Sequence, residues 1–301
     1  MKKFKYLLFI PAVAALVAGV QSCKLDTAGV KDNITSAQDF STAETEFAGA
    51  FDVADDINQS DGKIKKGAST ILPSGAVLDF VDSTFTDGDG IEYTLDFGPV
   101  GGSFPYGILC GDGKYRAGKL RISVSKPYAQ IGTSVTLTAS ESSNGEFYYS
   151  GDGTNMFRIE GVISYTRTAD QELTIAITDG KVYKELDKTA GSTHAAFRGN
   201  KVIKRTKGSG TPGMLGDEYE VTGSGSGTNI DGEDYTWSID VPLLKKIELG
   251  CAKTFVVGVL TIQNLSASSS LKVDFDPYKN GACDKVAKAI IGSREIIFTV
   301  K

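Results

Sequence analysis

Histidine, tryptophan and cysteine are scarce in this sequence. Its 301 residues hold one histidine, His194, one tryptophan and four cysteines. Catalysis by a Ser-His-Asp or Cys-His group would depend on that single histidine, and no nucleophile is identifiable near it. There is no Cys-x-x-Cys pair and no cluster of cysteine with histidine, which argues against a zinc site. We therefore expect no catalytic residue, no metal site and no enzymatic activity.

A long hydrophobic run is also lacking. The apolar stretch Tyr6–Val20 is too short for a spanning helix and follows three lysines, Lys2, Lys3 and Lys5. This pattern is typical of an export signal over residues 1–22. Removing it takes three lysines and no acid, which leaves 29 basic against 37 acidic side chains. An acidic chain is repelled by nucleic acid and by anionic headgroups, so we expect no nucleic-acid partner.

The end of this segment, Val20-Gln21-Ser22-Cys23, resembles the lipobox of bacterial lipoproteins. An aliphatic residue stands three places before the cysteine and a serine directly before it, while Gln21 departs from the usual small residue. The resemblance implies cleavage before Cys23 and acylation of Cys23. Two or three acyl chains suffice to hold a protein on a membrane. We expect a membrane partner through this anchor, in the cell envelope at the outer membrane, facing the periplasm or the cell surface.

The first part of the mature chain predicts a tether and then a helix. Residues 23–35 are polar and lack apolar periodicity, and Ser36–Asp39 and Ser41–Glu44 resemble helix-start boxes. Apolar residues then recur at helical spacing: Phe40, Ala43, Phe47, Phe51, Ala54 and Ile57. Asp39, Glu46, Asp52 and Asp56 fall on the opposite side. We expect an amphipathic helix within residues 36–62 whose phenylalanine stripe packs on the rest of the protein.

From residue 63 onward the pattern predicts strands. There are 35 glycines, and alternating apolar residues mark strands at 91–97, 118–125, 134–139, 156–167, 172–178, 181–186, 217–222, 233–240, 254–263, 270–275, 285–291 and 294–300. Asp179-Gly180, Gly199-Asn200 and Gly292-Ser293 resemble tight hairpin turns. The fold class expected is an all-β antiparallel sandwich with one N-terminal amphipathic helix packed on it. Two related units, about 70–208 and 209–301, are an alternative to a single body.

Two short segments recur. Leu95–Gly98 precedes Cys110 much as Val273–Asp276 precedes Cys283, and Gly161–Tyr165 resembles Gly258–Ile262. Two β modules of related build and ordinary β-strand composition both explain this echo.

One pattern carries a family resemblance. Tyr93–Gly98 followed by Cys110–Ile122, with the later Asn229–Tyr235 and Gly281–Asp284, resembles uncharacterised surface or periplasmic lipoproteins of the Bacteroidota. The resemblance covers about residues 35–301. It implies an all-β body and a cell-envelope address, and it carries over no activity.

Two tripeptides resemble the O-glycosylation sequon of that phylum. They are Asp26-Thr27-Ala28 and Asp82-Ser83-Thr84, which makes Thr27 and Ser83 candidate glycosylation sites.

With Cys23 acylated, an odd number of cysteines remains. Cys251 and Cys283 flank a predicted hairpin and are a candidate disulfide, worth about 3–4 kcal/mol in the chain-entropy model. Cys110 would then be a buried free thiol. A Cys110–Cys283 disulfide is the alternative.

Acidic residues gather in two glycine-rich segments, Asp87–Glu92 and Asp231–Asp234. We interpret both as solvated turns. Calcium binding by their carboxylates and glycoside hydrolysis by a carboxylate pair are the alternatives. No cofactor is therefore expected, with calcium as the open alternative.

Three other features predict ordinary structure. Gly223–Gly227 lacks the residues of a phosphate-binding loop and is expected to be flexible. The basic residues Lys201, Lys204, Arg205 and Lys207 are expected on a solvated face. Trp237 and Tyr148-Tyr149 could stack on sugar rings, but Trp237 alternates with Tyr235 and Ile239 as core residues do.

The resulting hypothesis is a non-catalytic, lipid-anchored envelope protein that binds a glycan or a protein partner or builds surface structure. A glycan-processing hydrolase with paired carboxylates is one alternative. A fimbrial-type adhesin subunit is another. Many such subunits are matured at an arginine after the tether, whereas the first arginine here is Arg116, inside the expected sheet.

Overall fold

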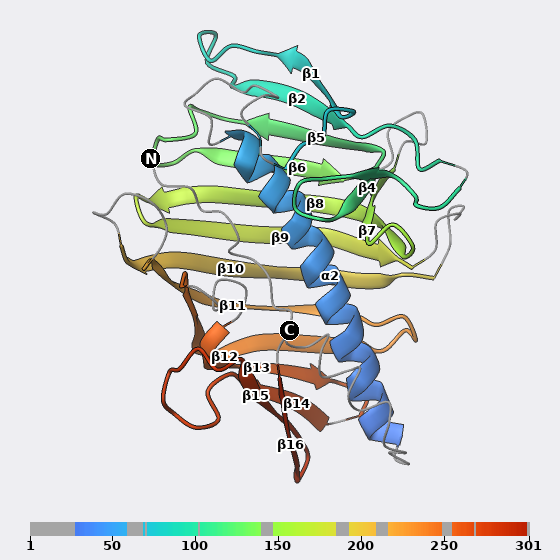
Figure 1. Ribbon diagram of the computed structural model, residues 1–301, viewed down its shortest axis with the longest axis vertical. Helices are drawn as coiled ribbons and strands as arrows, with labels where there is room; N and C mark the ends of the chain where they lie inside the picture. Colours follow the sequence, from blue (N-terminus) through green and yellow to red (C-terminus); the bar gives the residue numbers. More distant parts are fainter. Residues whose placement is uncertain are drawn as a thin grey trace. The chain divides into compact units, whose positions relative to one another are not determined.

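The structure is a computed structural model that describes residues 28–58, 69, 71–101, 103–139, 147–184, 193–208, 216–248, 255–267 and 269–299 (Figure 1). These residues form mostly antiparallel β-sheet with a single N-terminal helix, which confirms the predicted all-β, sandwich-like class. The elements are α2 (Ala28–Asn58), β1 (Val77–Asp82), β2 (Ile91–Asp96), β3 (Ile108–Leu109), β4 (Tyr115–Ala117), β5 (Lys119–Val124), β6 (Ser134–Ala139), β7 (Tyr148–Gly151), β8 (Met156–Ala169), β9 (Glu172–Tyr183), β10 (Ala195–Lys207), β11 (Glu218–Thr228), β12 (Asp234–Lys246), β13 (Phe255–Asn264), β14 (Ser269–Asp274), β15 (Val286–Ile291) and β16 (Arg294–Thr299). Across these ranges, no helix combines the length and the apolarity that crossing a membrane requires.

The chain divides into two compact units, and α2 contributes to both. The first unit holds Glu46–His194, with the last part of α2 and β1 to β9. The second unit holds α2 up to Thr45 and the chain from Ala195 onward, with β10 to β16. The two units therefore divide after His194. The alternative of two units predicted from the sequence divides later, after residue 208.

In the first unit the strand order is β1-β2-β5-β6-β8-β9, and every pair is antiparallel. A branch formed by β3, β4 and β7 joins the first half of β8. β8 pairs with β7 over Met156–Ile159 and with β6 from Gly161 onward. Gly161 has φ 126°, and a Cβ there would lie 2.8 Å from the Cα of Gly180. A glycine is therefore needed where β8 changes partners.

Two of the three predicted hairpin turns are wrong. Asp179 and Gly180 lie inside β9, where two residues oppose Gly161 as a β-bulge, and Asp179 takes φ 50°. Gly199-Asn200 lies in the middle of β10. Because a bulge and a hairpin both use a residue with positive φ, sequence alone did not separate them. Gly292-Ser293 does form the β15–β16 hairpin, closed by the pair Ile291–Arg294.

In the second unit the order is β10-β11-β12-β13-β14-β15-β16, again antiparallel. The predicted flexible loop Gly223–Gly227 is wrong, because these residues form the second half of β11. Gly225 pairs with Trp237 and Gly227 with Tyr235 across β11 and β12. A Cβ on Gly225 would lie 2.6 Å from Trp237 Nε1, and one on Gly227 would lie 2.5 Å from the hydroxyl oxygen of Tyr235. The glycines leave room for the two rings.

The predicted phenylalanine stripe of the helix is confirmed as core. Phe40 lies against Phe197 and Trp237, with ring centroids 5.9 and 5.4 Å apart, in the second unit. In the first unit Phe51 meets Tyr165 edge to face at 4.6 Å. The helix begins at Ala28, however, so the tether predicted over residues 23–35 is wrong from Ala28 onward.

The helix-start interpretation of Ser36 is therefore also wrong. Ser36 lies inside the helix, and its hydroxyl accepts hydrogen bonds from the side-chain amides of Asn229 and Asn264, each 3.1 Å away. A partner distant in sequence thus takes the hydroxyl that a cap would have used.

The acidic side of the predicted amphipathic helix is not solvated. Asp39, Glu46 and Asp56 are buried, and Asp52 is half-buried. Asp39 accepts a hydrogen bond from the backbone N–H of Ile230 at 2.6 Å, and Asp56 accepts one from Ser69 Oγ at 2.8 Å. The helix therefore buries polar as well as apolar side chains, and Asp39 and Asp56 each accept a hydrogen bond there.

The short sequence echo has a structural counterpart within each unit. The backbone N–H of Phe97 bonds the carbonyl of Gly118 at 2.9 Å, and that of Phe275 bonds the carbonyl of Gly258 at 3.0 Å. Both phenylalanines are buried, and both glycines have positive φ, 75° and 120°.

Gly225→Val should destabilise the protein. The added branched side chain meets the Trp237 ring and the backbone of β10, and overpacking of this kind costs about 1–3 kcal/mol or more. Ser224→Val is the matched control, because Ser224 is the exposed neighbour on the same strand and should change stability by less than about 0.5 kcal/mol. Urea denaturation followed by circular dichroism measures both. Equal midpoints for the two variants would contradict the packing role of Gly225.

The buried pair of Glu44 and Lys201 offers a second stability test in the second unit. Glu44→Leu alone should cost about 3–5 kcal/mol, because it leaves the Lys201 ammonium buried without its partner. The double variant Glu44→Leu with Lys201→Met should recover most of that loss, since both charges are gone. The exposed pair Lys207–Glu218 is the control, and Glu218→Gln should cost about 0–1 kcal/mol. A double variant no more stable than Glu44→Leu would refute the pairing.

Candidate functional site: the acidic turn between β1 and β2

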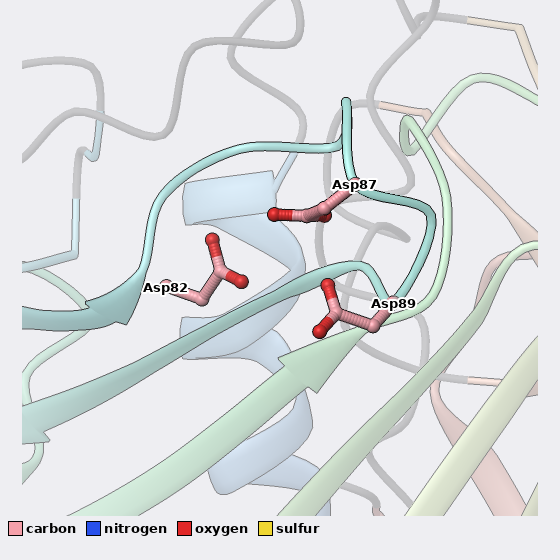
Figure 2. A group of neighbouring side chains, drawn as sticks. All are labelled: Asp82, Asp87 and Asp89. Atoms are coloured by element: carbon pink, nitrogen blue, oxygen red, sulfur yellow. The ribbon is translucent and has the colours of Figure 1, made fainter.

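Three carboxylates meet at the turn between β1 and β2. Oxygens of Asp82, Asp87 and Asp89 all lie within 4.8 Å of one another. Figure 2 shows the three side chains pointing toward a common space inside the turn. Asp87 and Asp89 are exposed, and Asp82 is half-buried. Among the described residues this is the one place where three potential metal-ligating side chains converge.

The local chain geometry brings Asp82 into this group. The β1–β2 register shifts between Phe80 and Asp82, so that Val81 is bulged out and Asp82 pairs with Glu92. Without the bulge Asp82 would share the face of Phe80, since side chains alternate along a strand. Gly90 closes the turn against β5, where a Cβ would lie 2.4 Å from the carbonyl oxygen of Val124.

Interactions within the turn shift the pKa values of Asp87 and Asp89 in opposite directions. A hydrogen bond from Asp89, together with the hydroxyl of Thr84 at 3.0 Å, lowers the pKa of Asp87. The same Asp87–Asp89 hydrogen bond and the negative charge of Asp87 raise the pKa of Asp89. No lysine or arginine occurs between residues 67 and 113, so no cation from this stretch offsets the three charges. The turn is an exposed, concentrated negative charge.

The chemistry open to this turn is limited. Carboxylate oxygens are ligands that Ca²⁺ prefers, but calcium takes about 6–8 oxygens, and three carboxylates that each bind through one oxygen supply only three of them. Glycoside hydrolysis needs one acid whose pKa is raised in a sheltered site, with its partner about 5–9.5 Å away. Asp89 is exposed, and its pKa is raised mainly by the hydrogen bond to Asp87 and by the charge of Asp87. The arrangement is therefore poorly suited to this reaction, and calcium remains the open alternative.

The second acidic segment, Asp231–Asp234, forms the β11–β12 turn. Asp231 and Asp234 are exposed as expected. The interpretation of Glu233 as a solvated acid is wrong, because its carboxylate accepts hydrogen bonds from Asn229 and Asn264 at 2.9 and 3.0 Å. These buried asparagines also hold Ser36 of α2, so Glu233 belongs to the packing of the helix.

The predicted solvated basic patch on β10 is only half correct. Lys204 and Lys207 are exposed, whereas Lys201 and Arg205 are buried. Lys201 pairs with Glu44 of α2. Arg205 pairs with Asp217 at 2.7 Å. Side chains alternate along a strand, so Lys201 and Arg205 point inward. Their ion pairs with Glu44 and Asp217 offset the cost of burying the two charges.

The cysteines are placed in part. Cys110 is free and buried, as predicted, and burial raises the pKa of its thiol despite the nearby Arg116. A free Cys110 excludes the alternative Cys110–Cys283 pairing. Cys283 is disulfide-bonded. Cys251 and Cys23 lie outside the described residues, so the Cys251–Cys283 disulfide and the acylation of Cys23 stay predictions.

The remaining candidates are aromatic or hydroxyl residues. Trp237 is buried, which confirms its predicted core role, and Tyr148 is buried as well. His194 is half-buried and lies against the ring of Tyr183, with centroids 4.9 Å apart. Ser83 is exposed in the acidic turn, which leaves it accessible to glycosylation, while Thr27 lies outside the described residues.

Sequence analysis missed a buried polar chain in the first unit. The hydroxyl of Tyr93 donates to Asn58 Oδ1 at 2.8 Å, and Asn58 Nδ2 donates to the hydroxyl of Tyr165 at 3.1 Å. The hydroxyl of Tyr128 bonds Asp55. Tyrosines at inward positions of strands were the available signal, because a buried hydroxyl requires a partner.

Comparisons with protein-family models, curated proteins and solved structures give no match for this chain.

Asp87→Asn should lower the pKa of Asp89 toward the ordinary aspartate value. The reason is that the two largest causes of the raised pKa, the hydrogen bond to Asp87 and its charge, both come from Asp87. The Asp89 proton should then be lost at lower pH than in the unsubstituted protein. NMR titration of the side-chain carboxyl carbons measures this. Asp82→Asn is the control and should move the pKa of Asp89 less. An unchanged Asp89 titration in Asp87→Asn would show that the two carboxyls are not in contact.

Proposed function

We propose that this protein is a non-catalytic, lipid-anchored protein of the cell envelope whose β body binds a partner or builds surface structure. The observation that carries the proposal is the N-terminal sequence, in which three lysines and an apolar run precede Ser22-Cys23. Cleavage before Cys23 and acylation there would tether the body to the outer membrane. The acidic mature chain would not hold to anionic headgroups by charge, so the lipid would be its anchor.

The inward-facing charged groups support binding or structure over catalysis. Arg116 is fully buried and bonds Asp112 at 2.6 Å and the hydroxyl of Tyr148 at 3.2 Å. Lys114 bonds Glu46 at 2.9 Å. A catalytic acid or base must keep a hydrogen-bonding position open for its substrate, whereas Arg116, Asp112, Lys114 and Glu46 hydrogen-bond to other side chains of the protein.

The aromatic residues favour a protein or structural partner over a glycan. Sugar rings stack on exposed aromatic faces, yet Trp237 and Tyr148 are in the core. Among the residues whose burial is described, the exposed aromatic residues Phe80, Phe104 and Tyr278 lie on separate segments of the chain. A glycan partner is therefore the second choice.

The two alternatives receive less support. A hydrolase would use paired acids, and Asp87 and Asp89 of the β1–β2 turn lack the burial that makes a general acid. A fimbrial-type subunit matured at an arginine after the tether would need an accessible arginine near the start of the body. The first arginine of the chain, Arg116, is fully buried in β4.

Cys23→Ala should release the protein from the membrane fraction. The unsubstituted protein should carry two or three acyl chains on an N-terminal Cys23, since one chain binds only marginally. Mass spectrometry of the N-terminal peptide and membrane fractionation measure the two results. Cys110→Ala is the control and should keep the lipid, because Cys110 is a buried thiol in the body. An unacylated N terminus, or membrane retention of Cys23→Ala, would refute the proposed anchor.

A further inference from the structure

We propose that copies of this chain join head to tail, with edge strand β1 of one copy against edge strand β16 of the next. This inference names a second copy of the chain as the partner for the structural role proposed above. It rests on the two edges and does not require the lipid anchor.

Each of the two strands is hydrogen-bonded on one side. Within the part of the chain that the structure describes, β1 pairs with β2 alone, and β16 pairs with β15 alone. The other side of each strand presents backbone N–H and C=O groups that none of the strands β1 to β16 takes up. Such an edge is a ready template for a strand from another chain.

Both edges also expose apolar side chains. In β1, Val77 is 54% exposed and Val81 is 72% exposed, and in β16, Ile297 is 56% exposed. Phe80 of β1 is 37% exposed although it lies beside the buried Tyr93. A strand added at either edge would cover these side chains as well as the backbone.

The two edges carry opposite charge, and this selects the occupant. Strand β1 and the turn after it hold four acids and no basic residue, namely Asp79, Asp82, Asp87 and Asp89, and a fifth acid, Glu92, follows in β2. The β15–β16 hairpin and the two residues before it hold Lys285, Lys288 and Arg294 against Asp284 and Glu295. Lys288 bonds Glu295 at 3.3 Å, and exposed Asp284 offsets exposed Lys285, which leaves the exposed Arg294 as the excess positive charge. A β1 edge would attract a β16 edge by this difference.

The same charges oppose pairing of like with like. Asp79 on the free edge and the bulge at Val81 are devices that keep edge strands from pairing indiscriminately. Two β1 edges would bring carboxylates together, whereas a β16 edge would neutralise them. The contact is heterologous, so each added copy leaves one β1 and one β16 open. Copies then form an open chain, or a ring if the rotation between them closes.

The test links the two edges chemically in the membrane-anchored protein. A variant with Val81→Cys and Ile297→Cys is treated with a short bis-maleimide and run on a denaturing gel. Of the cysteines that the structure describes, Cys110 is buried and Cys283 is disulfide-bonded, so the introduced thiols are the reactive ones. We expect a ladder of dimers, trimers and higher species. A gel that shows only species of monomer size after this treatment would overturn the proposal.

Single-cysteine copies fix the direction of the contact. Val81→Cys mixed with Ile297→Cys should give crosslinked dimers, and neither alone should give more than a trace. Dimers from one single variant alone would show like-with-like pairing and overturn the head-to-tail arrangement. Val241→Cys in place of Ile297→Cys is the matched control, because Val241 is 44% exposed on β12, which is bonded on both sides. A ladder as strong in that control would show random collision.

Charge reversal tests the basis of selection. Asp79→Lys with Asp82→Lys should abolish crosslinking to an unsubstituted β16 edge and restore it to one carrying Lys285→Glu and Arg294→Glu. Raising the salt from about 0.1 to about 1 M shortens the screening length from about 10 to about 3 Å and should weaken the ladder several-fold. Crosslinking that ignores both changes would overturn the charge argument. Acylation of Cys23 is measured in the same samples. This measurement shows whether a negative result comes from a missing lipid anchor or from a missing contact between the edges.

Discussion

The buried carboxylates of helix α2 determine where the helix can pack on the sheet of each unit. Asp39, Glu44, Glu46, Asp55 and Asp56 all lie in the interior. Their partners are the backbone N–H of Ile230 and the side chains of Lys201, Lys114, Tyr128 and Ser69, in that order. A buried carboxylate without a partner costs several kcal/mol, so each of these groups must face its own acid. The helix can lie on each unit's sheet only where the partners are in reach.

This constraint explains charged residues at inward positions of strands. Along β10 the inward residues are Phe197, Lys201, Ile203 and Arg205, so two cations stand in an apolar series. Phenylalanine contacts alone would tolerate a shift of the helix along the sheet, because apolar surfaces pack in more than one register. A buried ion pair does not tolerate such a shift, since moving Lys201 away from Glu44 leaves two uncompensated charges. The polar pairs thus select one position among those that the apolar stripe allows.

Much of the fold was predictable from the sequence because strand alternation and the helical stripe are local patterns. Residues Phe40 and Phe51 were identified as core by spacing alone. The errors lie where a distant partner decides the outcome. Gly223–Gly227 is a strand because Trp237 and Tyr235 cover it, and Ser36 is mid-helix because distant asparagines bind its hydroxyl. The acidic turn was visible in Asp87 and Asp89, but Asp82 joins them only through a bulge that the sequence does not mark.

The placement of polar groups also bears on how this protein recognises other molecules. Outward positions of β6 and β8 carry short hydroxyl side chains, and Ser134 bonds Thr166 across the two strands at 2.9 Å. Hydroxyls that satisfy one another offer a partner little apolar area and few open hydrogen bonds. An edge strand differs, because every second residue on it presents its main-chain N–H and C=O groups outward, whatever its side chain. Main-chain pairing is strong but unselective, so the selectivity of such a contact has to come from charge. The five acids from Asp79 to Glu92, with no cation among them in the sequence, would supply the selectivity of the proposed edge contact.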